Sequence, residues 1–420
     1  MYMCTDNVIF RNKDYVMFKL YSGIKQGLPL SPMLFIFYVN DMFETFRRVH
    51  GKCVECIFKL IHVLIHADDV TLLATDRSDT ISKLQTLCMY CNDNYIIPQT
   101  TKCKFCTING DIDDNRPLPF ANTVLNWVDH LEILGSHICS SGSLRDDLEL
   151  HMQKRFVSCI KYFNFCHENK LAPVSVRLKT LRACVMSSIL YNCETFGHLL
   201  PLKLVTIYNK LIRTGLQVRT STPSLVLYTE SGLLPVRALV EARQFKFFKR
   251  FQLSLQPDSE RQLVFDGLCD DPPKYLKHYK TLIDTYDSHQ EIYKYYDNDV
   301  KAKIRSHATN GKPRYEVYLK NNPNLDPSPF LQCMHPSAID LIRFRVGSHC
   351  LPIETGRWCQ KKKEDRICDV CETPGDEHHY LYDCPTIDRD DLNLDPDVSK
   401  IWWQPEVFQL IGRLKSQDLL

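Results

Sequence analysis

Two adjacent carboxylates, Asp68 and Asp69, lie between two short apolar runs in the stretch "LIHADDVTLLA". Successive side chains of a strand point to opposite faces, so both aspartates can serve one site only at the tip of a hairpin. We therefore expect "IFKLIHVLIH" and "VTLLA" to form two buried strands with the aspartates between them. Neighbouring carboxylates favour protonation unless a cation neutralises them, and oxygen ligands suit Mg²⁺ that also contacts substrate phosphates. The alternative for an isolated pair is a solvated Asp-Asp turn.

A glycine-bracketed loop, "SGIKQGLPLSP", precedes this pair. Gly23 and Gly27 allow the backbone to approach a ligand closely, and Gln26 offers both hydrogen-bond donors and acceptors. Ser31 is the expected N-cap of a helix that runs to about Val49, and the free N–H groups of such a helix favour anions. The alternative is a tight turn into a buried helix.

The middle of the chain has an uneven charge. Residues 151–250 carry 16 Lys and Arg against 4 Asp and Glu, although the net charge of all 420 residues is only +2. Apolar residues at helical spacing follow Ser143 and Pro173, so we expect this region to be helical, with aromatic residues interleaved among its charges. A nucleic-acid surface is favoured over a merely solvated one. The residues expected to be buried are Leu144, Leu148, Met152, Phe156 and Ile160 in the first helix and Leu178, Leu181, Val185 and Ile189 in the second.

Cysteine and histidine residues cluster near the C-terminus with the spacing Cys368-x2-Cys371-x7-His379-x4-Cys384. A C-x2-C pair followed closely by His and Cys can close a tetrahedral Zn²⁺ site. The alternative is a few incidental thiols in a chain with 19 cysteines. Nearby basic residues are candidate phosphate contacts, or else a solvated face: Arg343, Arg345, Arg357, Lys361, Lys362 and Lys363.

Taken together and in this order, "GIKQGLPLSP" and "HADDVTLLA" closely resemble motifs B and C of reverse transcriptases, with a specific likeness to non-LTR (LINE-type) retrotransposons. The resemblance continues through "QTTK", "LEILGSHI", "VMSSILYNCETFG" and "YTESGLLP". It also includes the C-terminal cluster, where a Cys-Cys-His-Cys segment is similar to one that ends many such chains. That alignment favours His379 over the adjacent His378 as the ligand.

The resemblance implies a palm polymerase that uses two Mg²⁺ (or Mn²⁺) ions, one acting on the primer 3′-hydroxyl and one on the leaving pyrophosphate. Asp68 would be the metal ligand and Asp69 its support, and Lys102 would protonate or stabilise the leaving group. RNA template, DNA primer and deoxynucleotides would be the partners. The residues implied to border the nucleotide and template are Gly23, Gln26, Gly27, Pro29 and Ser31.

Three departures from the family pattern predict impaired activity. His66 stands where the family usually has Tyr or Phe, and Gln99 replaces its Asn. The family's motif A, which supplies another metal-binding aspartate, should lie upstream of residue 1. Asp6 and Asp14 precede the glycine loop, but both are far too close to it. Because each 1.36 kcal/mol lost from transition-state stabilisation costs tenfold, we expect activity lower by orders of magnitude.

We therefore expect an α+β protein: a partial reverse-transcriptase palm followed by a helical thumb and a small zinc-binding domain. The expected boundaries are 1–140 for the palm, 141–255 for the basic thumb, 256–335 for an acidic, proline-containing connector and 336–420 for the zinc-binding domain. No membrane span is expected because the most apolar segments are interrupted by Lys59 and histidines.

The cysteines are odd in number and widely spread, and no secretory leader is expected, so we expect reduced thiols in an intracellular protein of the nucleus or cytoplasm. Two other interpretations remain open. One is a non-catalytic nucleic-acid-binding protein, either a relic or a domesticated one. The other is a zinc-stabilised scaffold that binds protein. The oligomeric state is left open.

Overall fold

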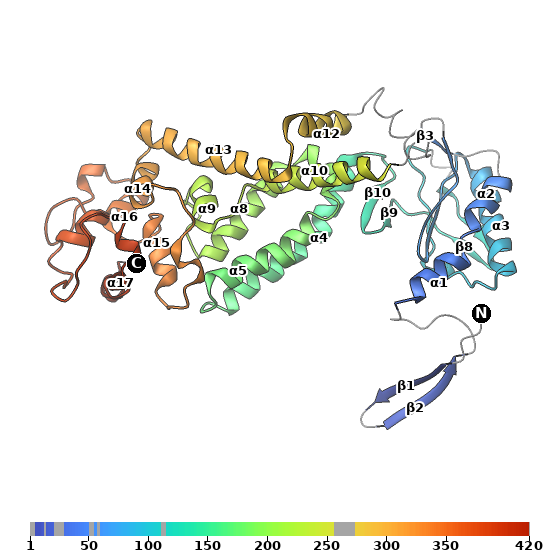
Figure 1. Cartoon of the computed structure of the whole chain (residues 1–420), viewed down its shortest axis with the longest axis horizontal. Coiled ribbons are helices and arrows are strands. Elements are labelled where there is room, and N and C mark those ends of the chain that lie inside the picture. The colour runs from blue at the N-terminus through green and yellow to red at the C-terminus, as the bar shows by residue number, and fades with distance from the viewer. Residues whose placement is uncertain are drawn as a thin grey trace. The chain divides into compact units, whose positions relative to one another are not determined.

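The computed structural model describes residues 5–11, 14–20, 29–49, 54–56, 59–110, 115–255 and 274–419 (Figure 1). The chain divides into two compact units. The first comprises the described residues up to Asp147 together with Leu255, and the second comprises residues 148–254 and the described residues from 274 onward. Short two-stranded sheets lie in the first unit and the second is mostly helical, so the fold is mixed α/β.

The first unit contains antiparallel two-stranded sheets and short helices. The first two strands pair antiparallel, with Arg11 opposite Asp14 in the backbone register. The strands are β1 Thr5–Arg11, β2 Asp14–Leu20, β3 Val54–Cys56, β4 Lys59–Ile61, β5 Val63–His66, β6 Asp69–Leu72, β7 Leu118–Phe120, β8 Thr123–Leu125, β9 His130–Ile133 and β10 Ser136–Cys139. The helices are α1 Ser31–Tyr38, α2 Met42–Val49, α3 Arg77–Asp93 and the 3₁₀ turn η1 Thr100–Lys102.

The single helix expected from Ser31 to about Val49 is wrong, because the chain forms two helices, α1 and α2, with a turn between them. Asp41 lies in this turn. Its backbone carbonyl accepts hydrogen bonds from the backbone N–H of Thr45 at 3.0 Å and from the Thr45 hydroxyl at 3.1 Å. Its carboxylate accepts a hydrogen bond from the Tyr90 hydroxyl at 2.5 Å. The aspartate therefore starts a new helix where apolar periodicity alone predicts a continuous one.

One apolar core joins α1, α2, α3 and the β5–β6 hairpin. The strands are not fully buried as expected, since β5 and β6 bury one face while Leu64 on the other face is half-exposed. The buried members are Val39, Met42, Phe46, Val63 and Tyr90, and the partly buried ones are Phe35, Ile65, Val70, Leu72, Leu87 and Ile96.

The second unit is built from helices, which continue through the segment expected to be a connector. Among the helices that the structure describes, none is long and apolar enough to cross a membrane. The elements are α4 Leu144–Glu168, α5 Val174–Thr180, the π-helical turn η3 Leu181–Met186, α6 Ser187–Ile189, α7 Cys193–Phe196, η4 Gly197–Leu199, α8 Leu202–Leu216, α9 Ser224–Ser231, α10 Val236–Ser254, α12 Lys274–Thr285, α13 His289–Thr309, α14 Pro313–Asn321, η5 Pro329–Gln332, α15 Ala338–Arg345, α16 Pro352–Trp358, η6 Lys363–Asp365, η7 His379–Asp383, η8 Ile401–Trp403 and α17 Glu406–Ser416.

The expected apolar faces of the two helices after Ser143 and Pro173 differ in outcome. All four apolar positions expected after Pro173 are buried. In α4, however, Phe156 and Ile160 are exposed. Each i+4 step advances about 40° around a helix of 3.6 residues per turn, so a row with this spacing drifts off the core. The residues that replace them in the core are Cys159, Tyr162 and Cys166.

A buried ion pair ties α9 to α15. The guanidinium Nε of Arg345 donates to the carboxylate of Glu230 at 3.0 Å, and the two side chains are 4% and 0% exposed. The Tyr318 hydroxyl from α14 donates to the same carboxylate at 2.9 Å. Because the two charges are removed from water, each depends on the other for compensation.

Arg345→Ala would leave the Glu230 carboxylate buried without its cation. We expect the free energy of unfolding to fall by about 3–5 kcal/mol. Urea denaturation of the full chain measures this loss. The double variant Glu230→Gln/Arg345→Met removes both charges and should recover most of it. A single variant as stable as the double one would show that the pair is not a structural tie.

Two histidines share a half-buried polar cluster where η4 and α12 meet α10. The ring of His278 lies 3.2 Å from the Gln244 side chain. Burial lowers the pKa of His278, and the charge of Arg237 lowers it further. Burial also lowers the pKa of His198, with a further contribution from His278. The folded chain therefore holds both rings neutral at pH values where unfolded histidine takes a proton.

Stability should fall as the pH drops below 6.5, the ordinary histidine value, because the unfolded chain then binds protons that the folded chain resists. His278→Gln should flatten this dependence while leaving stability above neutral pH similar. Urea midpoints at about pH 7.5 and about pH 5.5 measure the effect. An unchanged pH profile in the variant would count against this cause.

Candidate functional site

Asp68 and Asp69 lie at the tip of the β5–β6 hairpin. His66 pairs with Asp69, so the connecting turn consists of Ala67 and Asp68. Ala67 has a positive φ of 52°, a conformation that tight hairpin turns require. Both carboxylates are exposed. The structure thus places the pair where two neighbouring carboxylates can reach one ligand from a rigid strand end.

Successive side chains of the hairpin alternate between a face that packs into the core and an exposed face. Val63 pairs with Leu72 and Ile65 pairs with Val70, and these four pack into the apolar core. Asp69 directly precedes Val70 in β6, so its side chain lies on the opposite, exposed face. Phe35 of α1 packs against the same core, so this helix supports the hairpin on its core face.

The other residues expected at this site are only partly described. Gly23, Gln26 and Gly27 lie outside the described residues. Pro29 is exposed, and Ser31 is the first residue of α1, one position inside the helix rather than its cap. Lys102 is exposed at the end of η1, and no ion pair joins it to either aspartate in the described part of the chain.

The donor set at the hairpin fits Mg²⁺ only in part. Two carboxylates at one strand end are oxygen donors of the kind that Mg²⁺ prefers. Among the described residues, however, no third His, Cys, Asp or Glu forms a metal-holding group with Asp68 and Asp69. This hairpin by itself therefore offers two protein ligands.

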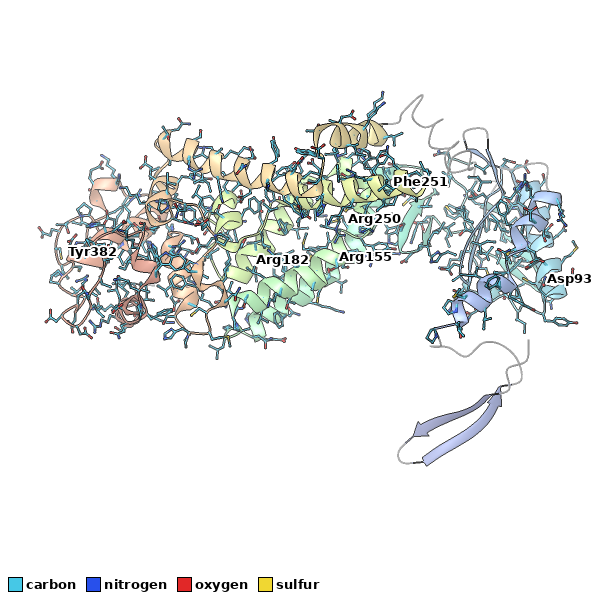
Figure 2. All side chains as sticks on the ribbon, viewed as in Figure 1. Asp93, Arg155, Arg182, Arg250, Phe251 and Tyr382 are labelled. Atoms are coloured by element: carbon cyan, nitrogen blue, oxygen red, sulfur yellow. The ribbon has the colours of Figure 1, made fainter. Side chains whose placement is uncertain are left out.

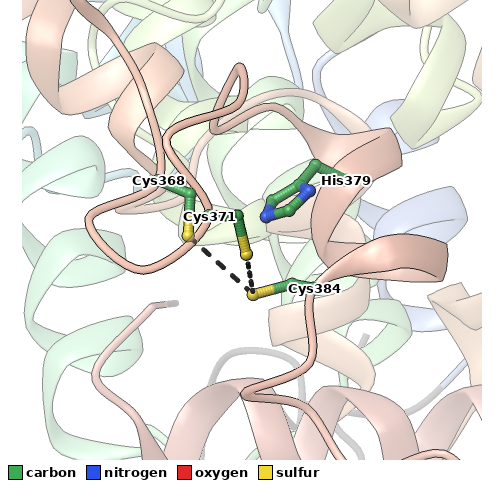
Figure 3. A group of neighbouring side chains, drawn as sticks. All are labelled: Cys368, Cys371, His379 and Cys384. Carbon is green, nitrogen blue, oxygen red and sulfur yellow. Dashed lines mark hydrogen bonds between the residues drawn. The ribbon is translucent and has the colours of Figure 1, made fainter.

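A second candidate centre is formed by Cys368, Cys371, His379 and Cys384, whose ligand atoms all lie within 4.8 Å of one another (Figure 3). The Cys384 sulfur is 3.9 Å from each of the other two sulfurs. Tetrahedral Zn²⁺ with Zn–S distances of about 2.3 Å requires sulfurs about 3.8 Å apart. The thiols therefore already stand at the spacing that zinc coordination needs.

Backbone hydrogen bonds hold these ligands in two facing turns. The N–H of Cys368 donates to Thr373 O at 2.8 Å, closing the first turn. The N–H of Cys384 donates to His379 O at 2.8 Å, closing the second around η7. The His379 Nδ1 atom lies 3.3 Å from the Thr373 hydroxyl, which links the two turns and orients the ring.

The polar atoms of the centre also favour a cation. The His379 Nε2 atom is buried and lacks a hydrogen-bond partner among the described residues. His378, by contrast, is exposed and lies 3.2 Å from Asp383. The structure therefore brings His379, and not its neighbour, to the three sulfurs.

Thiol acidities in the centre diverge. Burial alone would raise the pKa of Cys368, but hydrogen bonds from Tyr380 and from the backbone of Val370 and Cys371 outweigh it and lower the pKa to about 6. Burial and hydrogen bonding to the neighbouring thiols raise the pKa of Cys371 to about 11. One sulfur thus ionises readily and suppresses ionisation of the next, a repulsion that a bound cation would relieve.

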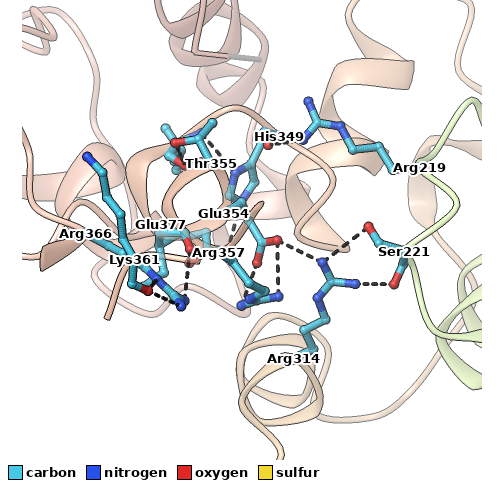
Figure 4. Close-up of polar contacts among 12 residues, drawn as sticks. Arg219, Ser221, Arg314, His349, Glu354, Thr355, Arg357, Lys361, Arg366 and Glu377 are labelled. Atoms are coloured by element: carbon cyan, nitrogen blue, oxygen red, sulfur yellow. Dashed lines mark hydrogen bonds and ion pairs between the residues drawn. The ribbon is translucent and has the colours of Figure 1, made fainter. Parts of the chain in front are cut away.

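The basic residues near this centre do not all face solvent. Arg345 is buried in its ion pair, so its expected role as a phosphate contact is wrong. Arg357 and Arg314 both pair with the buried carboxylate of Glu354 (Figure 4). Of the six candidates, the exposed ones are Lys361, Lys362 and Lys363.

Local spacing gives no signal for the residues that support the centre. The fully buried His349 ring lies 3.0 Å from the carboxylate of Glu377, two residues before His379. Arg219 donates from its guanidinium to His349 O at 2.9 Å across 130 residues (Figure 4). The metal turns are therefore connected through His349 to the loop after α8.

The glycine loop and the aspartate hairpin both lie in a segment that is similar to a known protein family. Residues 1–138 match the family model described as reverse transcriptase (RNA-dependent DNA polymerase). This matched region is therefore similar to reverse transcriptases at the level of the family. The comparison with curated proteins gave no match.

The reverse-transcriptase region ends before α4, so the matched segment includes Asp68, Asp69 and Lys102 but not the Cys/His centre. Divalent metal ions are typical of this family. At the hairpin, two adjacent carboxylates stand on an exposed tip and are oxygen donors of the kind that such ions prefer.

Purified chain should carry about one zinc ion, held by the Cys3His group. Cys371→Ser should lose it, because three ligands rarely retain structural zinc. Cys359→Ser alters an exposed thiol outside the group and should retain the metal. Atomic absorption of the three proteins gives the comparison. Equal zinc content in all three would count against this centre.

Proposed function

We propose that the chain is part of the RNA-directed DNA polymerase of a non-LTR (LINE-type) retrotransposon, and that its polymerase activity as this chain is weak. The observation that carries the proposal is the shared core of α1 and the β5–β6 hairpin. It joins the helix after "GIKQGLPLSP" to the turn that bears Asp68 and Asp69. A polymerase site needs this arrangement, with a nucleotide held opposite a metal-binding tip.

Each residue has a proposed role at this site. When bound, Mg²⁺ or Mn²⁺ would activate the primer 3′-hydroxyl and neutralise the leaving pyrophosphate. Asp68 would hold the metal and Asp69 would support it, while Lys102 would stabilise the leaving group. Gly23, Gln26 and Gly27 belong to the loop that borders the incoming nucleotide and template, and Pro29 and Ser31 continue that loop into α1.

Weak activity follows from the number of ligands. The described residues offer two carboxylates at the hairpin and no third partner in a metal-holding group. A missing metal ligand costs several kcal/mol of transition-state stabilisation, which corresponds to a loss of about 10²-fold to 10⁴-fold in rate.

Residues 148–254 are proposed to bind the template and primer. Their exposed surface is more basic than the composition indicates, because two of the five acidic residues, Glu230 and Glu241, are buried. Some basic residues are also withdrawn, since Arg177 is buried and donates to backbone carbonyls. Figure 2 shows Arg155, Arg182 and Arg250 on α4, η3 and α10. The exposed basic side chains are Lys154, Lys161, Lys170, Lys179, Arg182, Lys203, Lys210, Arg237, Lys246, Lys249 and Arg250.

Aromatic rings accompany these charges. The Arg155 guanidinium lies 5.3 Å from the Tyr191 ring centroid, and the Lys210 ammonium lies 5.2 Å from that of Phe163. Such cation–aromatic pairs favour contact with the bases and phosphates of single strands.

We propose that Zn²⁺ at the Cys/His centre stabilises a second nucleic-acid-binding region. The cysteines whose side chains are described are free thiols, which supports an intracellular location in the nucleus or cytoplasm.

A non-catalytic nucleic-acid-binding function, as a relic or a domesticated protein, is the second candidate. The incomplete ligand set at the hairpin favours it, because binding needs only the basic surface and not metal chemistry. The two candidates differ in one measurable property, copying of a template.

Primer extension on an RNA template with Mg²⁺ or Mn²⁺ tests the proposal. We expect extension at least about 10²-fold weaker than that of a complete polymerase, abolished by Asp68→Asn and unchanged by Asp93→Asn, which neutralises an exposed aspartate on α3. RNA affinity should fall steeply with salt in all three proteins. Vigorous extension that Asp68→Asn removes would overturn the weak-activity proposal. Absence of RNA binding would overturn the nucleic-acid function.

A further inference from the structure

The end of α16 carries an exposed tryptophan whose ring is held by an arginine. The guanidinium carbon of Arg219 lies 3.8 Å from the centroid of the Trp358 ring, yet 45% of Trp358 remains exposed. We propose that Trp358 and Arg219 form a stacking platform for an unpaired base of single-stranded nucleic acid. The proposal rests on the nucleic-acid function proposed above and assigns it a contact mode and a place.

Hydrogen bonds fix Arg219 on the ring before any ligand arrives. Its backbone N–H donates to the Ser348 hydroxyl at 2.9 Å. Its guanidinium donates to His349 O at 2.9 Å and to the Cys350 sulfur at 3.2 Å. The guanidinium lies over the indole ring while 45% of Trp358 stays exposed, and we infer that this exposed part receives a second planar group. A platform held in this way loses little side-chain entropy when a base stacks on it.

The chain after Trp358 turns back toward the platform. Gln360 adopts a left-handed conformation with φ of 56°, and its N–H donates to Arg357 O at 3.2 Å. The N–H of Lys361 donates to Gly356 O at 2.8 Å. This pair of bonds is the Schellman motif that ends a helix and reverses the chain. Lys361 is therefore held against the helix end that bears Trp358.

Arg366 locks the same loop from its far end. Its guanidinium donates twice to Lys361 O, at 3.1 and 2.8 Å. Its side chain passes so close to Gly356 that a Cβ there would lie 2.5 Å from it, which explains the glycine. Cys368 follows two residues later, so the platform loop and the metal turns share one rigid base.

The charge around the platform fits a polyanion. Lys361, Lys362 and Lys363 are exposed and form no ion pair among the described residues. Arg219 and Arg366 donate to backbone carbonyls or sulfur, and neither forms an ion pair with a carboxylate of the described residues. The opposing charges on this loop are those of Glu364 and Asp365. Phosphates on the lysines with a base on the indole account for both features together.

The test compares binding of labelled single-stranded RNA and of a duplex of equal length to the full zinc-loaded chain, by fluorescence anisotropy. Trp358→Ala should weaken single-strand binding by about 5-fold to 100-fold, whereas Trp358→Phe should retain most of it. The matched control is Trp403→Ala, an exposed tryptophan on η8 in the same unit, and it should change little. Duplex affinity should change little in every variant, because paired bases cannot stack on the ring.

Two further readouts separate the outcomes. A 2-aminopurine base in the strand should be quenched on binding, and Trp358→Ala should remove that quenching. Replacing Lys361, Lys362 and Lys363 with Gln should lower the dependence of affinity on salt. Equal losses in the Trp358 and Trp403 variants, equal losses on duplex, or failure of Trp358→Phe to bind would each overturn the platform.

Failure of the platform can be told from failure of the proposed function. A chain that binds single strands in a salt-sensitive way, without any effect of Trp358, keeps the function and loses the platform. A chain that binds no RNA loses both. Binding of an acidic peptide at Trp358 in place of RNA would assign the surface to a protein partner and overturn the proposal.

Discussion

The buried pair of Glu230 and Arg345 is the interaction on which the second unit depends. One carboxylate of α9 receives the guanidinium of α15 and the hydroxyl of Tyr318 from α14, so three helices distant in sequence converge on it. The same guanidinium lies 5.4 Å from the ring centroid of Trp402 in η8. Because a buried charge is unfavourable without its partner, an arrangement of these helices that separates Glu230 from Arg345 is disfavoured.

The metal centre is attached to this frame through α15. Directly after α15, Ser348 and His349 receive hydrogen bonds from Arg219, and the His349 ring contacts Glu377 beside the metal turns. The segment from 338 to 384 therefore has polar contacts with the helices before it and is not an isolated domain joined to them only by the backbone. Zinc coordination would brace a region that hydrogen bonds already align, so metal loss should affect the platform at Trp358 as well as the centre.

Local patterns predicted what depends on local spacing. The aspartate hairpin, the helices after Ser143 and Pro173 and the convergence of Cys368 with Cys371 each follow from residues within about one or two turns of one another. The prediction was wrong where one side chain from elsewhere decides the outcome, as when Asp41 and Tyr90 divide one helix into two.

Long-range polar contacts left no trace in the sequence. In the sequence, Arg345 cannot be told from the exposed basic residues near the cysteines. The Glu230 carboxylate, with which it forms a buried ion pair, is 115 residues away. Trp358 gives no signal until Arg219 is placed over its ring. The numbers of acidic and basic residues therefore predict the sign of the charge on a surface. They do not predict which residues form that surface, because some charged residues are buried in ion pairs.

Copying and binding place different demands on this chain. Catalysis by a carboxylate-held metal pair needs several ligands within a fraction of an ångström, and the described hairpin offers two. Binding a strand needs positive charge and a few aromatic faces, which tolerate displacement because phosphates and bases repeat along the polymer. In the function proposed above, the exposed basic and aromatic side chains of the helical unit would supply that charge and those faces. Loss of one function consequently need not entail loss of the other.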